Sequence, residues 1–145
     1  MTIPADRSRP LDTNADARAR NWTQMTHLVG LLAALPGVSV AALVGTVAMW
    51  LIRRQESEFV DDHGREAANF QISILIYSIF GAIFAVVTAG LGAPVAAVAI
   101  GGLTLYGGIR GAMASGRGEY YRYPMCLRLL HEPEAPSSAG FVPPY

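Results

Sequence analysis

The sequence lacks lysine entirely and contains a single cysteine, Cys126. With one cysteine, an intrachain disulfide is impossible and zinc sites built from several cysteines are excluded. The formal net charge is zero, so the chain has no overall basic field of the kind that attracts nucleic acid. We therefore expect no nucleic-acid partner.

Charge is also missing from two long stretches of the chain. Between Trp22 and Ile52 the only side chain that can carry charge near neutral pH is His27, and between Phe70 and Ile109 there is none. A helix that faces water on one side needs polar residues in every turn. These stretches therefore predict an integral membrane protein rather than a soluble domain.

The apolar stretches predict four helices, at about residues 22–35, 38–54, 62–90 and 94–115. The uncharged run within the third helix, Phe70 to Leu91, is about 33 Å long at the α-helical rise, enough to cross the hydrocarbon core. Each of the first two helices provides only about 21 Å of apolar length, against about 30 Å for the core. Whether this first pair spans the bilayer fully stays open.

The connections between helices decide the topology. Pro36 and Gly37 interrupt the first apolar stretch, which is either one kinked helix or a hairpin. A hairpin there, with a second hairpin at residues 90–94, places all eleven arginines on one side of the membrane, as the positive-inside rule favours. We therefore expect an all-α membrane protein of four helices in two hairpins, the first pair short, with both termini cytoplasmic.

This topology divides the chain into three parts: a flexible cytoplasmic N-terminal tail (1–21), a four-helix membrane domain (22–130) and a Pro-rich C-terminal tail (131–145). Aromatic and arginine side chains that flank apolar helices commonly anchor them at the membrane interface. We expect this role for Trp22, Trp50, Arg53, Arg54, Tyr121 and Tyr123.

The densest polar cluster precedes the longest apolar run and comprises Asp61, Asp62, His63, Glu66, Asn69 and Gln71. Such a group could bind a divalent metal, but it lacks the paired histidines of helical metal sites, so we expect none. We interpret it as a helix start that Asp61 or Asp62 caps, with Glu66 paired to an arginine such as Arg53. The two amides, Asn69 and Gln71, are expected to bond between helices.

Small residues recur four apart on the last two predicted helices, where they allow close helix packing. The positions concerned are Gly81, Ala85, Gly101, Gly102, Gly107, Gly108 and Gly111. Their spacing does not say whether they pack within a hairpin or against a partner.

The sequence contains no Gly-rich phosphate loop, no Ser/His/Asp arrangement and no paired carboxylates within the apolar stretches. A proton relay through His27 would need an acidic partner at similar depth, and the apolar stretches contain none. We therefore expect no catalytic residues, no cofactor and no enzymatic activity.

Residues 56–73, with the sequence ESEFVDDHGREAANFQIS, resemble the signature of a Tic-twenty-like bacterial membrane family of unknown function. That family is distantly similar to the small four-helix subunit of the chloroplast inner-envelope import translocon. Trp22 with His27, the helix end at Trp50–Arg54 and Tyr121–Pro124 fall where the family has similar residues. The resemblance covers about residues 22–130, and it implies a four-helix protein of the bacterial cytoplasmic (inner) membrane and little mechanism.

These observations favour a non-enzymatic accessory or assembly subunit, a scaffold within a larger membrane complex such as a photosynthetic or respiratory one. Its expected partners are membrane lipids and other membrane protein subunits. The translocon resemblance suggests the alternative, a component of a protein translocation or small-solute transport system. A signalling protein that senses through the Asp61–Asn69 cluster is a third possibility.

Overall fold

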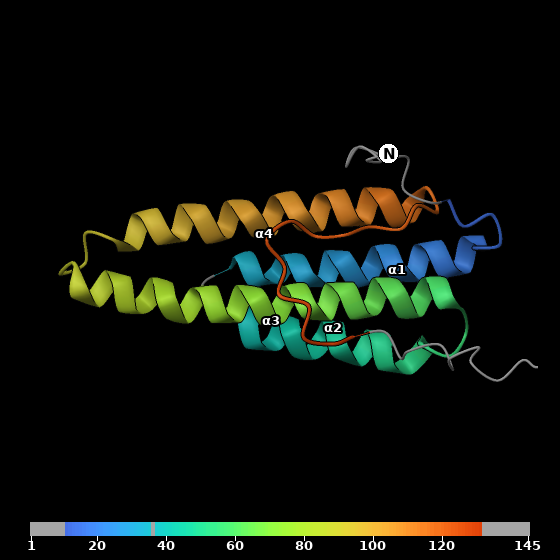
Figure 1. Cartoon of the computed structure of the whole chain (residues 1–145), viewed down its shortest axis with the longest axis horizontal. Coiled ribbons are helices and arrows are strands. Elements are labelled where there is room, and N and C mark those ends of the chain that lie inside the picture. Colours follow the sequence, from blue (N-terminus) through green and yellow to red (C-terminus); the bar gives the residue numbers. More distant parts are fainter. Residues whose placement is uncertain (1–10, 36, 132–145) are drawn as a thin grey trace, which may run out of the picture.

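The computed structural model describes residues 11–35 and 37–131, which form four α-helices and contain no named strand. The elements are α1 (Ala17–Gly30), the short 3-10 helix η1 (Leu31–Ala34), α2 (Ser39–Arg53), α3 (Glu58–Val87) and α4 (Ala93–Gly116). Figure 1 shows α1 and α2 packed beside one end of the much longer pair α3 and α4. The predicted all-helical fold of two hairpins with a short first pair is confirmed.

The first helix begins five residues before the predicted start at residue 22. Asp16 caps it, because its side-chain oxygen accepts a hydrogen bond from the Ala19 amide at 2.7 Å. Just before the cap, the Asp12 amide donates to the Gly118 carbonyl at 2.9 Å. Residues 17–21 of the predicted tail are therefore the first turn and a half of α1. The rest of that tail (1–10) and residues 132–145 lie outside the described residues.

The third helix begins at Glu58, four residues before the predicted start. Ser57 provides the cap and accepts a hydrogen bond from the Val60 amide at 3.2 Å. The predicted cap by Asp61 or Asp62 is wrong, because Asp61 instead accepts hydrogen bonds from the Trp50 indole, at 2.8 Å, and from Arg65. Ser57 has the helix-capping geometry because its backbone is extended, with φ −163° and ψ 155°.

Two of the four helices, α3 and α4, are long and apolar enough to cross a membrane. The turn between them is closed by the Thr88 hydroxyl, which accepts a hydrogen bond from the Gly92 amide at 2.7 Å. Gly90 in this turn has φ +92°, a conformation that suits glycine. The apolar helix α2 has 15 residues, about 22 Å at the helical rise.

Helix α3 packs tightly against α2 at Gly64. A Cβ atom at this position would lie 2.7 Å from Trp50 Cβ and 2.3 Å from Trp50 Cδ1. The Trp50 indole is fixed by its hydrogen bond to Asp61 and cannot easily move away. Only glycine therefore fits at this contact.

We expect Gly64→Ala to lower the free energy of unfolding by about 1 to 3 kcal/mol, because the added methyl group overpacks the contact with Trp50. Thermal unfolding in a mild detergent measures the change. The matched control is Gly102→Ala on α4, where nothing lies within 4 Å of an added Cβ. The control should be neutral or slightly stabilising, because alanine favours helix over glycine. Equal effects of the two substitutions would contradict the close contact.

Candidate functional site: the polar face of α3 and the C-terminal strap

After α4 the chain runs back over the helices as an extended segment, residues 119–131, which we call the strap (Figure 1). The strap is bound by one line of polar side chains on α3, which we call the polar face. Its members follow the helical spacing of three or four residues and are Asp62, Glu66, Asn69, Ser73 and Tyr77. Each of the five contacts the strap through a hydrogen bond or an ion pair.

Asn69 holds the end of the strap with both ends of its amide group. Its Oδ1 atom accepts hydrogen bonds from the backbone amides of Leu129, at 3.0 Å, and Leu130, at 2.7 Å. Its Nδ2 atom donates to the Leu130 carbonyl at 3.0 Å. Since Asn69 is buried, these three bonds satisfy an amide that would otherwise be costly inside the protein.

The two carboxylates of the polar face bind strap arginines. Asp62 forms a bidentate pair with Arg122, with both N–O distances at 2.6 Å. Glu66 accepts a hydrogen bond from the Tyr123 amide at 3.0 Å and pairs with Arg128 at 3.3 Å. Both carboxylates are buried while the arginines are half exposed. The strap therefore supplies the partners that these buried carboxylates need.

The strap also reaches deeper along α3 and then returns. The Ser73 hydroxyl accepts a hydrogen bond from the Leu127 amide at 2.9 Å, and the Tyr77 hydroxyl donates to the Met125 carbonyl at 2.7 Å. The chain turns back at Met125, whose φ is +51°. An extended chain in apolar surroundings needs partners for its backbone groups, and these side chains supply them.

A chain of hydrogen bonds links the strap to α1 and α3 through two fully buried histidines, His27 and His63. The Tyr123 hydroxyl lies 2.6 Å from His27 Nδ1, His27 Nε2 lies 2.8 Å from His63 Nδ1, and His63 Nε2 lies 3.1 Å from the Glu119 carbonyl. A carbonyl only accepts, so His63 Nε2 carries a proton. In a neutral His63 ring, Nδ1 then accepts from His27. His27 Nδ1 then accepts from Tyr123, and both neutral imidazoles are satisfied.

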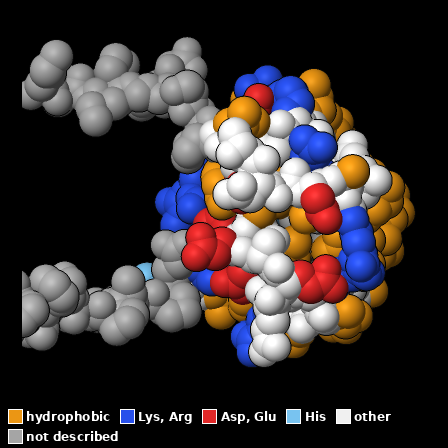
Figure 2. All heavy atoms as spheres, turned by 90° about the vertical axis from the view of Figure 1, so that its right-hand side faces the viewer, with side chains coloured by type: hydrophobic (Ala, Val, Ile, Leu, Met, Phe, Trp, Pro, Cys, Tyr) orange, Lys and Arg blue, Asp and Glu red, His pale blue; other side chains and the backbone are white. Residues whose placement is uncertain are grey.

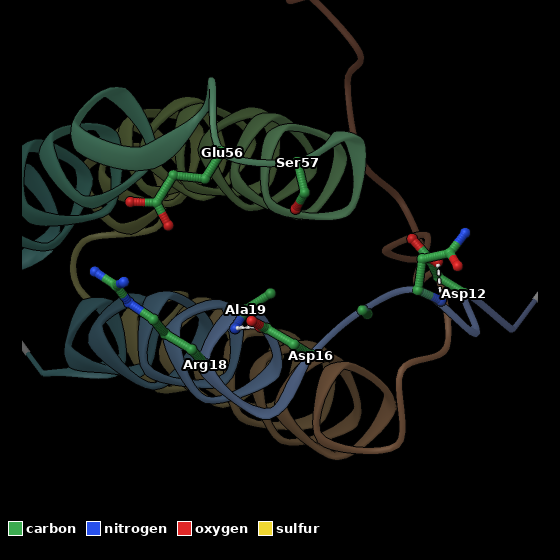
Figure 3. Close-up of a pocket in the computed structure, with 8 residues that line it drawn as sticks. Asp12, Asp16, Arg18, Ala19, Glu56 and Ser57 are labelled. Atoms are coloured by element: carbon green, nitrogen blue, oxygen red, sulfur yellow. Dashed lines mark hydrogen bonds between the residues drawn. The ribbon is translucent and has the colours of Figure 1, made fainter.

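A separate pocket of about 210 Å³ lies at the polar end of the molecule, between the start of α1 and the loop before α3. Figure 3 shows Arg18 and Glu56 on opposite walls of it. Its carboxylates already have roles: Asp16 caps α1, and Asp12 accepts a hydrogen bond from Tyr120 at 3.1 Å. Burial and this bond raise the pKa of Tyr120 to about 12.

Among the described residues no group of three or more His, Cys, Asp or Glu is placed to hold a metal ion.

Residues 18–130 match the model of the MamF/MmsF family, the magnetosome magnetite crystal formation proteins. This match covers more than half of the chain. The chain belongs to the MamF/MmsF family. The resemblance to the Tic-twenty-like family is therefore wrong as an identification. No curated protein and no solved structure matches the chain.

In this MamF/MmsF protein the predicted polar cluster does not stay together as one group. Asp62, Glu66 and Asn69 bind the strap, while Gln71 donates to the Gly30 carbonyl of α1 at 2.8 Å. Glu66 pairs with Arg128 rather than with Arg53, which instead lies 3.6 Å from Glu56.

The predicted interfacial anchors divide into two groups. The Trp22 indole donates to the Met49 carbonyl at 3.1 Å, and the Arg53 guanidinium lies 4.2 Å from the centre of its ring. In the same way Arg54 lies 5.9 Å from the Trp50 ring. The prediction is wrong for Tyr121 and Tyr123, which are buried in the core and are not exposed to an interface. Tyr123 stacks on Phe70 with ring centres 3.9 Å apart.

The predicted small-residue positions have three different surroundings. Added Cβ atoms at Gly107, Gly108 and Gly111 would meet Tyr123, Leu31 and His27 respectively. Gly81 would meet Ala96 and Ile100 across the second hairpin, and Ala85 lies one turn further along the same helix. At Gly101 and Gly102 nothing lies within 4 Å.

Sequence reasoning did not identify the bonds of His27 with Tyr123 and His63, or those of Ser73 and Tyr77 with the strap. One signal was available. Ser73 and Tyr77 continue the spacing of Asp62, Glu66 and Asn69 into an apolar stretch. Polar side chains on one face of a helix at that depth need a polar partner.

Proposed function

We propose that this chain is a non-enzymatic accessory protein of the magnetosome membrane that supports magnetite crystal formation as an assembly subunit beside other membrane proteins. The proposal rests on the family match over residues 18–130. The magnetosome membrane is an invagination of the bacterial inner membrane, which agrees with the location expected from the sequence. Membrane lipids and other membrane protein subunits are the proposed partners.

The use of the polar side chains supports a structural role. The described polar face of α3 is engaged with the strap, and His27 and His63 are engaged with Tyr123 and Glu119. These contacts bind the chain to itself and fix the packing of the helices. The expected translocation function depended on the Tic-twenty-like resemblance, which the family match has replaced, and the family description names no energy-transducing complex.

We further propose that both termini and the loop between α2 and α3 lie in the cytoplasm, flanking a four-helix membrane domain of about residues 22–130. The described arginines lie in the half of the molecule where α1 and α3 begin and α2 and α4 end. They are Arg18, Arg20, Arg53, Arg54, Arg65, Arg110, Arg117, Arg122 and Arg128. Figure 2 shows charged side chains gathered on this end. Excess arginine marks the cytoplasmic side of a membrane protein.

Two measurements on the source bacterium test this function. Extraction of the tagged full-length protein in mild detergent should yield it in fixed stoichiometry with other magnetosome membrane proteins. Deletion of the coding sequence should alter the size or number of magnetite crystals seen by electron microscopy, and the intact sequence should restore them. A lone monomer or homo-oligomer together with unchanged crystals would overturn the proposal.

A further inference from the structure

The first hairpin reaches only part of the way along the second. Gly30, the last residue of α1, is level with Gln71 of α3, because the Gln71 amide donates to the Gly30 carbonyl at 2.8 Å. Leu31 is level with Gly108 of α4, where an added Cβ would lie 2.3 Å from Leu31 Cδ2. Beyond these contacts η1 adds only four residues, about 8 Å at the 3-10 rise.

The second hairpin continues well past this point. From Gln71 to the end of α3 at Val87 there are 16 residues, about 24 Å of helix. After subtraction of the length of η1, α3 and α4 project about 16 Å beyond the first hairpin, which is about half the thickness of the hydrocarbon core. Figure 1 shows this two-helix projection, residues 79–100, which we call the distal arm.

The distal arm exposes an apolar surface of the kind that lipid covers. Its two helices pack on each other through Gly81, which faces Ala96 and Ile100. Its large apolar side chains are exposed, namely Ile79, Phe80, Ile83, Phe84, Val86, Val87, Leu91, Val95 and Val98. The opposite half of the molecule contains all four helices and the strap. The protein therefore has about twice the cross-section at one end as at the other, at about 10 Å per helix.

We propose that the chain is a wedge in the bilayer, and that the surface it fits is a membrane curved so that its cytoplasmic side is convex. The positive-inside rule places the wide, arginine-rich end in the cytoplasmic leaflet. A flat bilayer must then distort to fill the space around the narrow distal arm, and such mismatch carries an energetic cost. Bending that expands the cytoplasmic leaflet relieves this cost.

This inference rests on the proposed function for its biological setting. An invagination of the inner membrane has its cytoplasmic leaflet on the convex side. The wedge therefore favours the direction of curvature that such a membrane has. The wedge would concentrate the chain in curved regions and stabilise their curvature. Both properties belong to the isolated protein and lipid, and they can be measured without magnetite or partner proteins.

The test uses the full-length chain with Cys126→Ser and Leu91→Cys, so that the only thiol lies in the exposed turn at the tip of the distal arm. The protein is reconstituted into small sonicated and large extruded vesicles of the same phosphatidylethanolamine and phosphatidylglycerol mixture. An impermeant maleimide labels molecules whose distal arm faces outward. We expect the ratio of protected to labelled molecules to rise several-fold in the small vesicles. Equal ratios in both would overturn the wedge.

A variant with a longer first hairpin gives the matched control. Two helical turns of leucine and alanine are inserted after Ala34 and again before Ser39, so that the hairpin crosses the whole core. Circular dichroism and size-exclusion chromatography check that this variant folds. Its orientation should no longer depend on vesicle size. A dependence as strong as that of the original chain would contradict the assignment of curvature sensing to the short hairpin.

The depth of the first hairpin is measured independently. In the Cys126→Ser background, Leu35→Cys and Leu91→Cys carry a bimane fluorophore in vesicles that contain lipids brominated at different depths. Bromines near the ends of the acyl chains should quench position 35 most strongly, and bromines near the headgroups should quench position 91. The same depth profile at both positions would overturn the wedge geometry even if the family role stands. Failure of the crystal and co-purification experiments alone would leave this geometry intact.

Discussion

Replacing His27 by leucine should lower the free energy of unfolding by about 2 to 6 kcal/mol, which makes it one of the two most damaging substitutions that we expect in this chain. Leucine fills a similar volume but leaves the Tyr123 hydroxyl and His63 Nδ1 without their described partner in a buried site. A buried polar group that loses its hydrogen-bond partner lowers stability by about 1 to 3 kcal/mol. Reversible unfolding in a mild detergent, followed by circular dichroism, measures the loss.

A double-mutant cycle shows whether the hydrogen bond itself is responsible. Tyr123→Phe removes the hydroxyl that His27 Nδ1 accepts from. When the Tyr123 hydroxyl is already absent, His27→Leu leaves one buried group fewer without a hydrogen-bond partner. The double variant should therefore be more stable than the sum of the two single losses predicts. The exposed His131 provides the control, because His131→Gln should leave stability unchanged. Strictly additive losses would contradict the bond between His27 and Tyr123.

The helices could be predicted because their evidence is local in the sequence. A charge-free run such as Phe70 to Leu91 forms a helix in a membrane wherever the remaining chain lies, since its backbone must be satisfied within the segment. Arginine placement then fixed the two hairpins. The starts of α1 and α3 were less predictable, because several neighbouring polar residues can cap a helix. Asp16 and Ser57 have the required backbone geometry, and no pattern in the sequence distinguishes them from Asp61.

The strap could not be predicted, because an extended segment has no periodicity that marks its partner. Its contacts join residues about sixty positions apart, such as Arg122 with Asp62 and Leu130 with Asn69. Each pairs a side chain on a helix with a backbone group or an arginine, and many other pairings would satisfy the same chemistry. Tyr121 and Tyr123 were predicted to be interfacial anchors because nothing in the sequence shows which residues they contact. Their burial became clear only when Tyr123 was seen between Phe70 and His27.

Replacing Asn69 by leucine should release the end of the strap, with a loss of about 2 to 5 kcal/mol. The substitution leaves the Leu130 amide and carbonyl without their partner on α3. The Leu129 amide also loses Asn69 but still donates to the Leu127 carbonyl at 3.1 Å. Each backbone group without a hydrogen-bond partner lowers the free energy of unfolding by about 1 to 3 kcal/mol when it stays buried. The loss is smaller where release of the strap lets water reach the group. The total therefore falls below the sum of three full penalties.

Hydrogen exchange followed by mass spectrometry separates release of the strap from general unfolding. In the Asn69→Leu variant, the amides of Leu129 and Leu130 should exchange much faster, while those in the second half of α3 keep their protection. The exposed Asn21 of α1 gives the matched control, and Asn21→Leu should leave the strap amides protected. Unchanged exchange in the Asn69→Leu variant would mean that Asn69 does not hold the strap. The carboxylate pairs of Asp62 and Glu66 would then be the contacts that fasten it to α3.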